Sequence, residues 1–260
     1  MSPNKFVWYD LMTTDLKAAE VFYTAVIGWT ATDSGLTDRA YSILSKDSAM
    51  VAGLMGMPDH MRVGGAQPGW NGHIGVDNVD AEAERVKAAG GTIHRAPEDI
   101  PNGIGRFSVV SDSGSAVFIL FQPGPMPEGQ SAPPEPPAGT PGHVGWHELH
   151  AWDGAAAWEF YSGLYGWTKA EAVDMGPMGI YQTFSTGNYP VGGMMTKMPE
   201  APAPFWLFYF NVDAVDAAVE RLTRAGGKVM MGPHQVPGGS WIVQAIDPQG
   251  AIFAIVSMTR

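Results

Sequence analysis

Two segments of the chain repeat each other without a gap, and this repeat limits the folds that the chain can adopt. Residues 7–30 align with residues 145–168, so that Gly28 falls on Gly166. Each segment starts with the alternation typical of a half-buried strand and continues with apolar residues three or four positions apart, as in a helix. Asp15 stands where it can cap the first of these helices. The repeat indicates two copies of one structural unit.

A weaker copy of the same pattern follows within each half. In the first half, a strand-like run leads to a helical stripe that starts at Val79 and ends at Gly90-Gly91. The equivalent stripe of the second half ends at Gly226-Gly227. Short apolar runs after each helix predict further strands. The fold is therefore predicted to be α+β, with two tandem domains that are each a pair of βαβββ modules.

The domain bounds follow from the repeat and from one biased segment. Residues 122–142 contain eight prolines and few residues that can form a core. Proline-rich segments favour an extended conformation, so residues 123–142 are predicted to be a linker. The two domains are then residues 1–122 and 143–260.

The composition excludes several classes of function. A formal net charge of −11 argues against binding to nucleic acid or to an anionic membrane, both of which attract clustered lysine and arginine. The chain has no cysteine, which excludes thiolate nucleophiles and cysteine-ligated metals. It has no apolar run long enough to span a bilayer and no signal-peptide pattern, so we expect a cytoplasmic protein. A monomer and a homodimer are both compatible with the sequence.

Three motifs carry a resemblance to a known family. They are the D-L/G-x-A-A…F-Y…G-W helix, the V-D-x-V-D…A-G-G helix, and D-P-Q-G-A-I-F-A-I near the end of the chain. Together they resemble the vicinal oxygen chelate superfamily, which includes glyoxalase I, bleomycin-resistance proteins and extradiol dioxygenases. The W-x-[DE]-L motif with a doubled domain resembles the glyoxalase-like proteins of bacteria. The resemblance implies a curved, partly closed sheet around a cleft in each domain, and a small molecule as the partner.

Strand alternation predicts which side chains face each cleft. Leucine is retained between the two copies of the first strand, so it is expected under the helix. The opposite face then carries tryptophan and a carboxylate in both halves. By the same argument on the other strands, the residues expected to contact a ligand are Trp8, Asn71, His73, Trp146 and Tyr209, and the resemblance implies Phe118 as a further one. A cleft lined by these aromatic and polar residues would suit a flat apolar ligand.

The resemblance also implies positions for a metal site, which can be carried over one at a time. The first-strand ligand falls on Trp8 or Trp146, and the ligand of the second module on Asn71 or Leu207. The glutamate of the final strand falls on Phe118 or Ala254, when Gly114 is aligned with Gly250. The remaining positions, 53–55 and 193–195, hold no histidine or carboxylate. Tryptophan, leucine, phenylalanine and alanine cannot coordinate a divalent cation, so we expect no metal and no other cofactor.

The candidate catalytic residues are Glu148, His150 and Asp10. Glu148 and His150 share a strand face, as a proton-transfer pair requires, whereas Asp10 has Met12 at the position equivalent to His150. We expect any chemistry to lie in the second half. The same carboxylates are also compatible with a structural, hydrogen-bonded role.

Two functions remain open from the sequence. The first is a glyoxalase-like lyase or isomerase that acts on a small carbonyl or aromatic compound through these carboxylates, without the family metal. The alternative is a non-catalytic protein that binds and sequesters a small molecule, as bleomycin-resistance proteins do. Retained carboxylates favour the enzyme, and the abundance of tryptophan and methionine favours the binding protein.

Overall fold

The computed structural model describes residues 4–37, 39–125, 129 and 134–260, and these residues form two sheets of eight strands. The strand order is β2-β3-β4-β1-β5-β8-β7-β6 in one sheet and β10-β11-β12-β9-β13-β16-β15-β14 in the other. Both orders are open, so neither sheet closes into a barrel. Within each sheet β1 pairs with β4, β5 with β8, β9 with β12 and β13 with β16 in parallel. The antiparallel pairs are β2–β3, β3–β4, β6–β7 and β7–β8 in one sheet, and β10–β11, β11–β12, β14–β15 and β15–β16 in the other.

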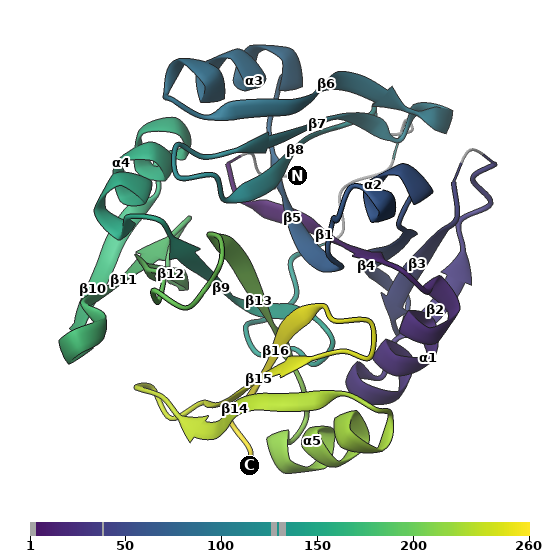
Figure 1. The fold of residues 1–260 in the computed structure, drawn as a ribbon, viewed down its shortest axis with the longest axis vertical. Coiled ribbons are helices and arrows are strands. Elements are labelled where there is room, and N and C mark those ends of the chain that lie inside the picture. Colours follow the sequence, from purple (N-terminus) through teal and green to yellow (C-terminus); the bar gives the residue numbers. More distant parts are fainter. Residues whose placement is uncertain (1–3, 38, 126–128, 130–133) are drawn as a thin grey trace. The chain divides into compact units, whose positions relative to one another are not determined.

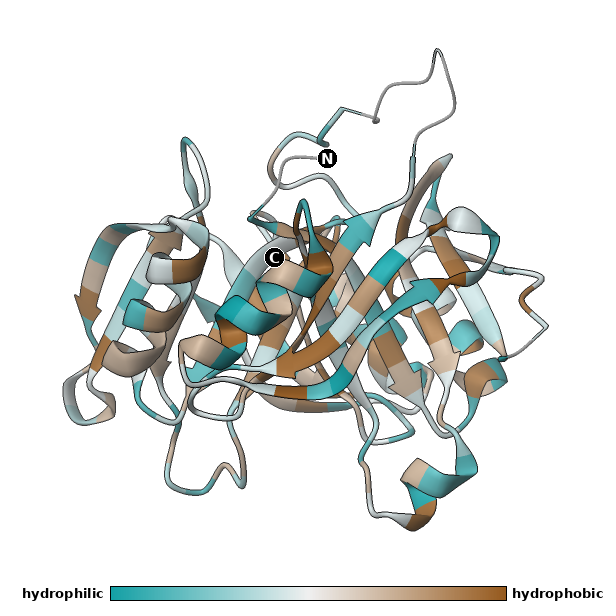
Figure 2. Cartoon of the chain, turned by 90° about the horizontal axis from the view of Figure 1, so that it is seen from above, coloured by the Kyte–Doolittle hydropathy of each residue, from teal (hydrophilic) through white to brown (hydrophobic). Residues whose placement is uncertain are grey.

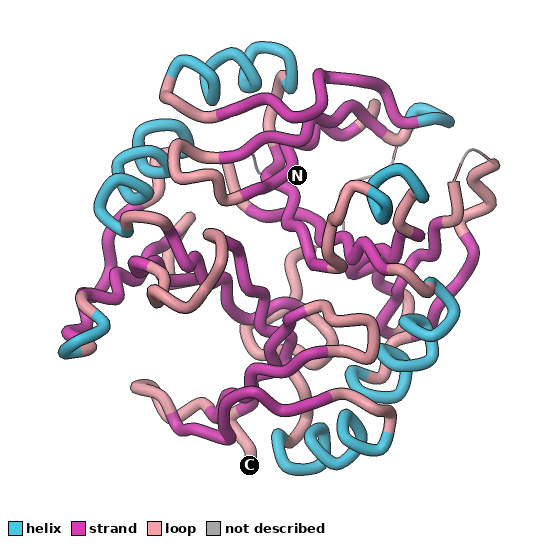
Figure 3. Tube along the Cα trace, viewed as in Figure 1, coloured by secondary structure: helices cyan, strands magenta, loops and turns pink. Residues whose placement is uncertain are grey.

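The order of elements confirms the predicted α+β fold of tandem domains with repeated βαβββ modules (Figures 1 and 3). The first half consists of β1 (Phe6–Thr13), α1 (Leu16–Ile27), β2 (Thr30–Asp33), β3 (Tyr41–Lys46), β4 (Ala49–Gly56), α2 (Asp59–Val63), β5 (Gly69–Gly75), α3 (Val79–Ala88), β6 (Thr92–Ile100), β7 (Gly105–Ser111) and β8 (Val117–Pro123). The second half consists of β9 (Val144–Ala151), α4 (Gly154–Tyr165), β10 (Thr168–Asp174), β11 (Ile180–Ser185), β12 (Pro190–Thr196), β13 (Phe205–Asn211), α5 (Val215–Arg224), β14 (Lys228–Gln235), β15 (Trp241–Ile246) and β16 (Ile252–Ser257).

Local sequence signals explain where the repeated helices begin and end. The Asp15 side chain accepts a hydrogen bond from the backbone N–H of Ala18, and Asp153 caps α4 in the same way. Both helices end at a glycine in the left-handed conformation, Gly28 at φ 81° and Gly166 at φ 68°. Apolar and polar residues alternate along many strands, so that one face of each is available for the core (Figure 2).

The contacts among the elements define two compact units that do not follow the halves of the sequence. Unit 1 contains the described residues within Met1–Val7, Asn71–Pro134 and His147–Trp206. Unit 2 contains those within Trp8–Trp70, Glu135–Trp146 and Leu207–Arg260. Each unit therefore combines one module from each half. The bounds predicted for the domains and for the linker, 123–142, remain a prediction, and residues 126–128 and 130–133 of that linker lie outside the described residues.

In unit 2, a buried chain of hydrogen bonds joins α1 to the turn before β16. Trp70 donates its indole N–H to the Tyr23 hydroxyl at 3.0 Å, and Tyr23 donates to the Asp247 carboxylate at 3.1 Å. The other carboxylate oxygen of Asp247 accepts backbone N–H groups from Gln249 and Ala251. Burial raises the pKa of Asp247, because the charged carboxylate loses hydration. These bonds satisfy polar groups that would be costly to bury alone.

Unit 1 contains the equivalent chain, built from α4 and the turn before β8. Trp206 donates to the Tyr161 hydroxyl at 3.0 Å, and Tyr161 donates to Asp112 at 3.2 Å. Burial likewise raises the pKa of Asp112. An arginine strengthens each pairing of modules: Arg85 donates to the carbonyl of Leu164 in unit 1, and Arg221 donates to that of Val26 in unit 2.

The turns at Asp112 and Asp247 correct one prediction from the sequence. Asp112 accepts the backbone N–H of Ala116 as Asp247 accepts that of Ala251, so the two turns have the same length. The residue with positive φ is Ser115 (79°) in one turn and Gly250 (101°) in the other. Aligning Gly114 with Gly250 was therefore wrong by one residue.

This shift changes the position of Phe118. Phe118 is fully buried and its ring contacts Phe160, Tyr161 and Tyr165 of unit 1. It therefore packs against α4 and does not lie on the face predicted for a ligand. The position equivalent to Ala254 is Ile119, because Ile119 pairs with His73 as Ala254 pairs with Tyr209.

No helix among the described residues is long and apolar enough to span a membrane.

The chain of hydrogen bonds predicts the effect of removing a tyrosine hydroxyl. We expect Tyr161→Phe or Tyr23→Phe to lower the free energy of unfolding by about 1–3 kcal/mol, because each removes the hydroxyl that bonds to one oxygen of a buried aspartate and to a buried indole N–H. Urea denaturation measures this loss. Tyr189→Phe is the control, since Tyr189 is 51% exposed. Negligible losses of unfolding free energy in all three variants would show that the buried tyrosine hydroxyls do not stabilise the fold.

A second prediction concerns His147 on β9, which stacks on Phe6 with 4.6 Å between ring centroids and bonds to the carbonyl oxygen of Val191 at 2.8 Å. Burial lowers the pKa of His147 from 6.5 to about 4. The unfolded chain therefore takes up a proton at higher pH than the folded chain does. As pH falls from 6.5 to 4, the free energy of unfolding should drop by about 3 kcal/mol from this group.

The control for this prediction is His147→Phe, which keeps a flat ring against Phe6 and removes the titrating group. Subtracting its pH profile of stability from that of the wild type isolates the contribution of His147. Parallel profiles for the two proteins between pH 4 and 6.5 would show that burial does not shift this imidazole.

Candidate active site

Strand β9 brings the two predicted proton-transfer residues of the second half together. Glu148 and His150 are two residues apart on the strand, so their side chains leave the same face. The His150 Nε2 atom lies 2.8 Å from the Glu148 Oε1 atom, and 15% and 12% of the respective side chains are exposed. The structure therefore forms the carboxylate–imidazole pair that the sequence predicted.

A tyrosine that sequence reasoning missed holds the other oxygen of this carboxylate. Tyr181 on β11 donates its hydroxyl hydrogen to the Glu148 Oε2 atom at 3.0 Å. His150 and Tyr181 thus engage one oxygen each. A carboxylate bonded at both oxygens has a fixed orientation.

The ring of Tyr181 reaches Glu148 across a residue without a side chain. Gly193 on β12 is the register partner of Glu148 on one side and of Thr183 on the other. A Cβ atom at Gly193 would overlap the Tyr181 ring. Glycine at this position is therefore a condition for the bond between Tyr181 and Glu148.

The imidazole of His150 is held in turn by Phe205 at the start of β13. The two rings are stacked, with 4.6 Å between their centroids and 8° between their planes. This contact, together with the bond to Glu148, fixes the plane in which the imidazole nitrogens lie. We name Glu148, His150, Tyr181 and Phe205 the β9 cluster.

The first half repeats the acid, the tyrosine and the glycine, and it has Met12 at the strand position of His150. Tyr41 donates to the Asp10 Oδ1 atom at 2.6 Å, and the Trp8 indole donates to the same atom at 2.9 Å. Gly53 is the register partner of Asp10, and a Cβ atom there would overlap Tyr41. Burial, followed by the nearby charge of Asp10, raises the pKa of Tyr41. Asp10 therefore lies in a hydrogen-bonded setting formed by a tryptophan and a tyrosine.

The other residues predicted to contact a ligand lie on several strands. His73 is buried on β5, with its ring 6.1 Å from that of Phe121. Tyr209 on β13 is buried and accepts a hydrogen bond from Gln244 at 2.8 Å. Asn71 on β5 and Trp146 on β9 are half-buried. A role for these four residues in binding remains a prediction.

The sequence did contain a signal for the missed residues. Tyr41 and Gly53 recur as Tyr181 and Gly193, each 140 positions later. The gap-free repeat has an offset of 138 positions, so the second half has gained two residues before β11. Following the repeat across that insertion would have identified the tyrosine and the glycine in both halves.

The residues present do not fit the metal site that the resemblance implies. Within the described part of the chain, no group of three or more histidine, aspartate or glutamate side chains is placed to hold a metal ion. The corrected alignment puts Ile119 at the final-strand position of the first half, and an isoleucine offers no ligand atom.

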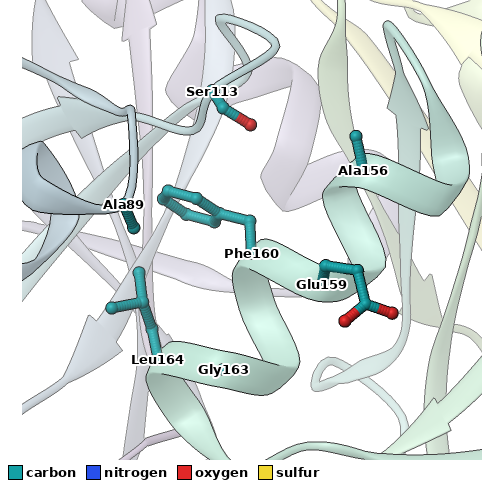
Figure 4. A pocket seen from close by; sticks show the side chains of 7 residues that line it. All are labelled: Ala89, Ser113, Ala156, Glu159, Phe160, Gly163 and Leu164. Carbon is teal, nitrogen blue, oxygen red and sulfur yellow. The ribbon is translucent and has the colours of Figure 1, made fainter.

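A separate surface pocket of about 440 Å³ lies in unit 1 between the end of α3 and one face of α4. The ring of Phe160 points toward Ala89, whereas the carboxylate of Glu159 points to the other side of the helix (Figure 4). Four of its seven lining residues are small: Ala89, Ser113, Ala156 and Gly163. The other three are Glu159, Phe160 and Leu164. The pocket has one ionisable side chain and shares no residue with the β9 cluster, so it is not the acid–base site.

Comparisons with known proteins agree with the geometry of the fold. Residues 140–255 match the Glyoxalase/Bleomycin resistance protein/Dioxygenase superfamily, and residues 7–121 match the Glyoxalase-like domain. The chain is 33% identical over 272 residues to an anthracycline biosynthesis protein, DnrV, of Streptomyces peucetius, covering 99% of this chain and 94% of the relative. It is also 33% identical over 258 residues to the putative glyoxylase CFP32 of Mycobacterium bovis, covering 98% and 94%.

Solved structures show the same fold at low sequence identity. The Mn(II)-bound glyoxalase from Novosphingobium aromaticivorans superposes with a TM-score of 0.68 at 15% identity, covering 99% of this chain and 83% of that one. The 2,2',3-trihydroxybiphenyl 1,2-dioxygenase from Sphingomonas wittichii superposes with a TM-score of 0.70 at 15% identity, covering 98% and 91%. With both halves matched by family models and relatives aligned along nearly their whole length, the chain belongs to the glyoxalase/bleomycin resistance protein/dioxygenase superfamily, the vicinal oxygen chelate superfamily that its motifs resemble.

Proposed function

We propose that this protein is a lyase- or isomerase-type enzyme that moves a proton on a small carbonyl or aromatic compound. The observation that carries the proposal is the hydrogen bond between Glu148 and His150, in which Tyr181 fixes the second carboxylate oxygen. A proton acceptor held in one orientation is what abstraction of a proton next to a carbonyl group requires.

The hydrogen bonds assign a role to each group of the pair. An ionised carboxylate only accepts hydrogen bonds, so His150 donates Nε2–H to Glu148 when the imidazole is neutral. Nδ1 is then the atom of His150 that accepts a proton. Glu148 orients the ring and stabilises the imidazolium that forms, as a carboxylate does beside a catalytic histidine.

A proton taken by Nδ1 from a carbon next to the carbonyl leaves an enolate on the substrate. Returning the proton to a neighbouring atom completes an isomerisation. Loss of a leaving group from the carbon next to the enolate, with transfer of the imidazolium proton to that group, completes a lyase reaction and restores the neutral imidazole. Both outcomes need the imidazole to keep its orientation between the two steps, which the stacking on Phe205 supports. No oxidant or reductant is consumed in either case.

The class of substrate is supported by the chemistry of the site and by the relatives. Phe205 offers a flat apolar ring beside the imidazole. One relative is named an anthracycline biosynthesis protein and another a putative glyoxylase. A ketone or aldehyde with an acidic neighbouring C–H, including one on an aromatic framework, is consistent with both names.

The alternative is a protein that binds a small molecule without reacting with it. The Trp8–Asp10–Tyr41 cluster supports this reading for the first half, because an indole and a phenol already satisfy its carboxylate. Met12 occupies the position equivalent to His150, so the first half does not supply the imidazole from this strand position.

The first prediction of this proposal is that the reaction needs Glu148. Panels of aldehydes and ketones are incubated with the protein in D₂O, and exchange of the proton next to the carbonyl is followed by NMR. Glu148→Gln should slow exchange by about 10²–10⁴-fold, because the amide cannot stabilise the imidazolium. Asp10→Asn is the matched variant in the other half and should retain most of the exchange.

The opposite pattern, with Asp10→Asn inactive and Glu148→Gln active, would show that the catalytic carboxylate is Asp10 of the first half. If both variants retain exchange, the carboxylates are structural and the binding protein is the better description. Circular dichroism melting of each variant shows whether lost exchange reflects lost folding.

The second prediction is that this activity does not depend on a bound divalent metal. The family positions hold Trp8, Asn71 and Ile119 in one half, and Trp146, Leu207 and Ala254 in the other. Protein purified without chelator should contain less than about 0.1 equivalents of zinc, nickel, manganese or iron by mass spectrometry, since three protein ligands are normally needed to retain such an ion. A stoichiometric metal whose removal abolishes exchange would overturn this part of the proposal.

A further inference from the structure

We propose that Tyr181 is a positioning residue for the acid–base pair, and that Gly193 is the residue that allows it to act. This inference rests on the proposed function of Glu148 and His150. It adds two residues that touch no reacting atom in that mechanism and act only through the carboxylate.

The position of the Tyr181 hydroxyl explains why its loss would matter. His150 engages Oε1 of Glu148, and Tyr181 donates to Oε2. A carboxylate bonded through one oxygen can still rotate about its last side-chain bond, whereas bonds to both oxygens from different strands prevent that rotation. Tyr181 therefore keeps Oε1 in line with Nε2 of His150, which fixes the imidazole proton on Nε2.

The missing side chain of Gly193 explains how the phenol reaches the carboxylate. Tyr181 comes from β11 and Glu148 from β9, and β12 runs between these two strands. The ring must therefore cross the surface of β12, and it does so above Gly193. Any side chain at this position would displace the ring or force the strands apart.

The first half contains the same device in an independent copy. The Tyr41 ring passes over Gly53 and its hydroxyl bonds to Asp10. The same three residue types therefore occur on equivalent strands in both halves. In each half the tyrosine passes over the glycine and fixes the orientation of the carboxylate. The first half thus provides matched control variants that disturb the same local structure without touching His150.

The first test measures which nitrogen of His150 carries the proton. The ¹⁵N chemical shifts of the ring distinguish the two neutral forms, and the spectrum of His150→Gln identifies the signals. We expect the Nε2–H form to dominate in the wild-type protein and to lose population in Tyr181→Phe, which removes only the hydroxyl. Tyr41→Phe should leave the His150 signals unchanged. Identical His150 signals in the wild type and Tyr181→Phe overturn the proposal.

The second test asks whether Gly193 acts through Tyr181. Gly193→Ala should lower the melting temperature and reduce the Nε2–H population of His150 in the wild-type background. The same change should have little effect on either quantity in Tyr181→Ala, where no ring remains to be displaced. Gly53→Ala should lower the melting temperature without altering the His150 signals. An equal effect of Gly193→Ala in both backgrounds overturns the proposal.

Neither test measures turnover, so the positioning role of Tyr181 and the proposed reaction can be tested separately. If Gly193→Ala does not fold, the spectrum of Tyr181→Phe still decides. If both tests succeed while Glu148→Gln retains proton exchange, the positioning of the carboxylate is established and only the proposed reaction is wrong.

Discussion

The structure depends on a buried hydrogen bond between a helix tyrosine and an aspartate from the opposite half of the sequence. Tyr23 and Asp247 are 224 residues apart, and Tyr161 and Asp112 form the equivalent bond in the other unit. A tryptophan N–H completes each chain, so that a phenol, an indole and a carboxylate are buried without unsatisfied charge. These bonds tie the module that contains α1 to the module that contains α5, and the module that contains α3 to the module that contains α4. Each half of the sequence forms its own sheet, whereas these helix-to-turn bonds connect one half with the other.

The packing of strand β9 in unit 1 holds the candidate site in place. Glu148 lies one position from Leu149, which is fully buried in unit 1, so the backbone of β9 is anchored on the side opposite the carboxylate. Neighbouring strands then supply Tyr181, Gly193 and Phe205, each acting on the carboxylate or on the imidazole. Both halves contain the acid, the glycine and the tyrosine, whereas the residue two positions after the acid is Met12 in the first half and His150 in the second.

Much of this was predictable from the sequence because it is local. The caps at Asp15 and Gly28, the modules and the pairing of Glu148 with His150 follow from periodicity and strand alternation. The position of Phe118 did not follow, because Ser115 takes the left-handed turn conformation that the alignment assigned to a glycine. Tyr181 was missed because its partner is two strands away in the sheet. The bonds between the halves could not be read from the sequence, because a contact such as that between Tyr23 and Asp247 leaves no periodic pattern.

The central claim is that Glu148 and His150 form the site at which a small molecule reacts. A crystal structure of the untreated protein, or of protein soaked with a compound that undergoes proton exchange, tests this claim most directly. We expect density for an organic ligand with a carbon next to a carbonyl group about 3–3.5 Å from Nδ1 of His150. Ligand density only in the surface pocket between α3 and α4, or only against Asp10, with no contact to the β9 cluster, would contradict the claim that Glu148 and His150 form the reactive site.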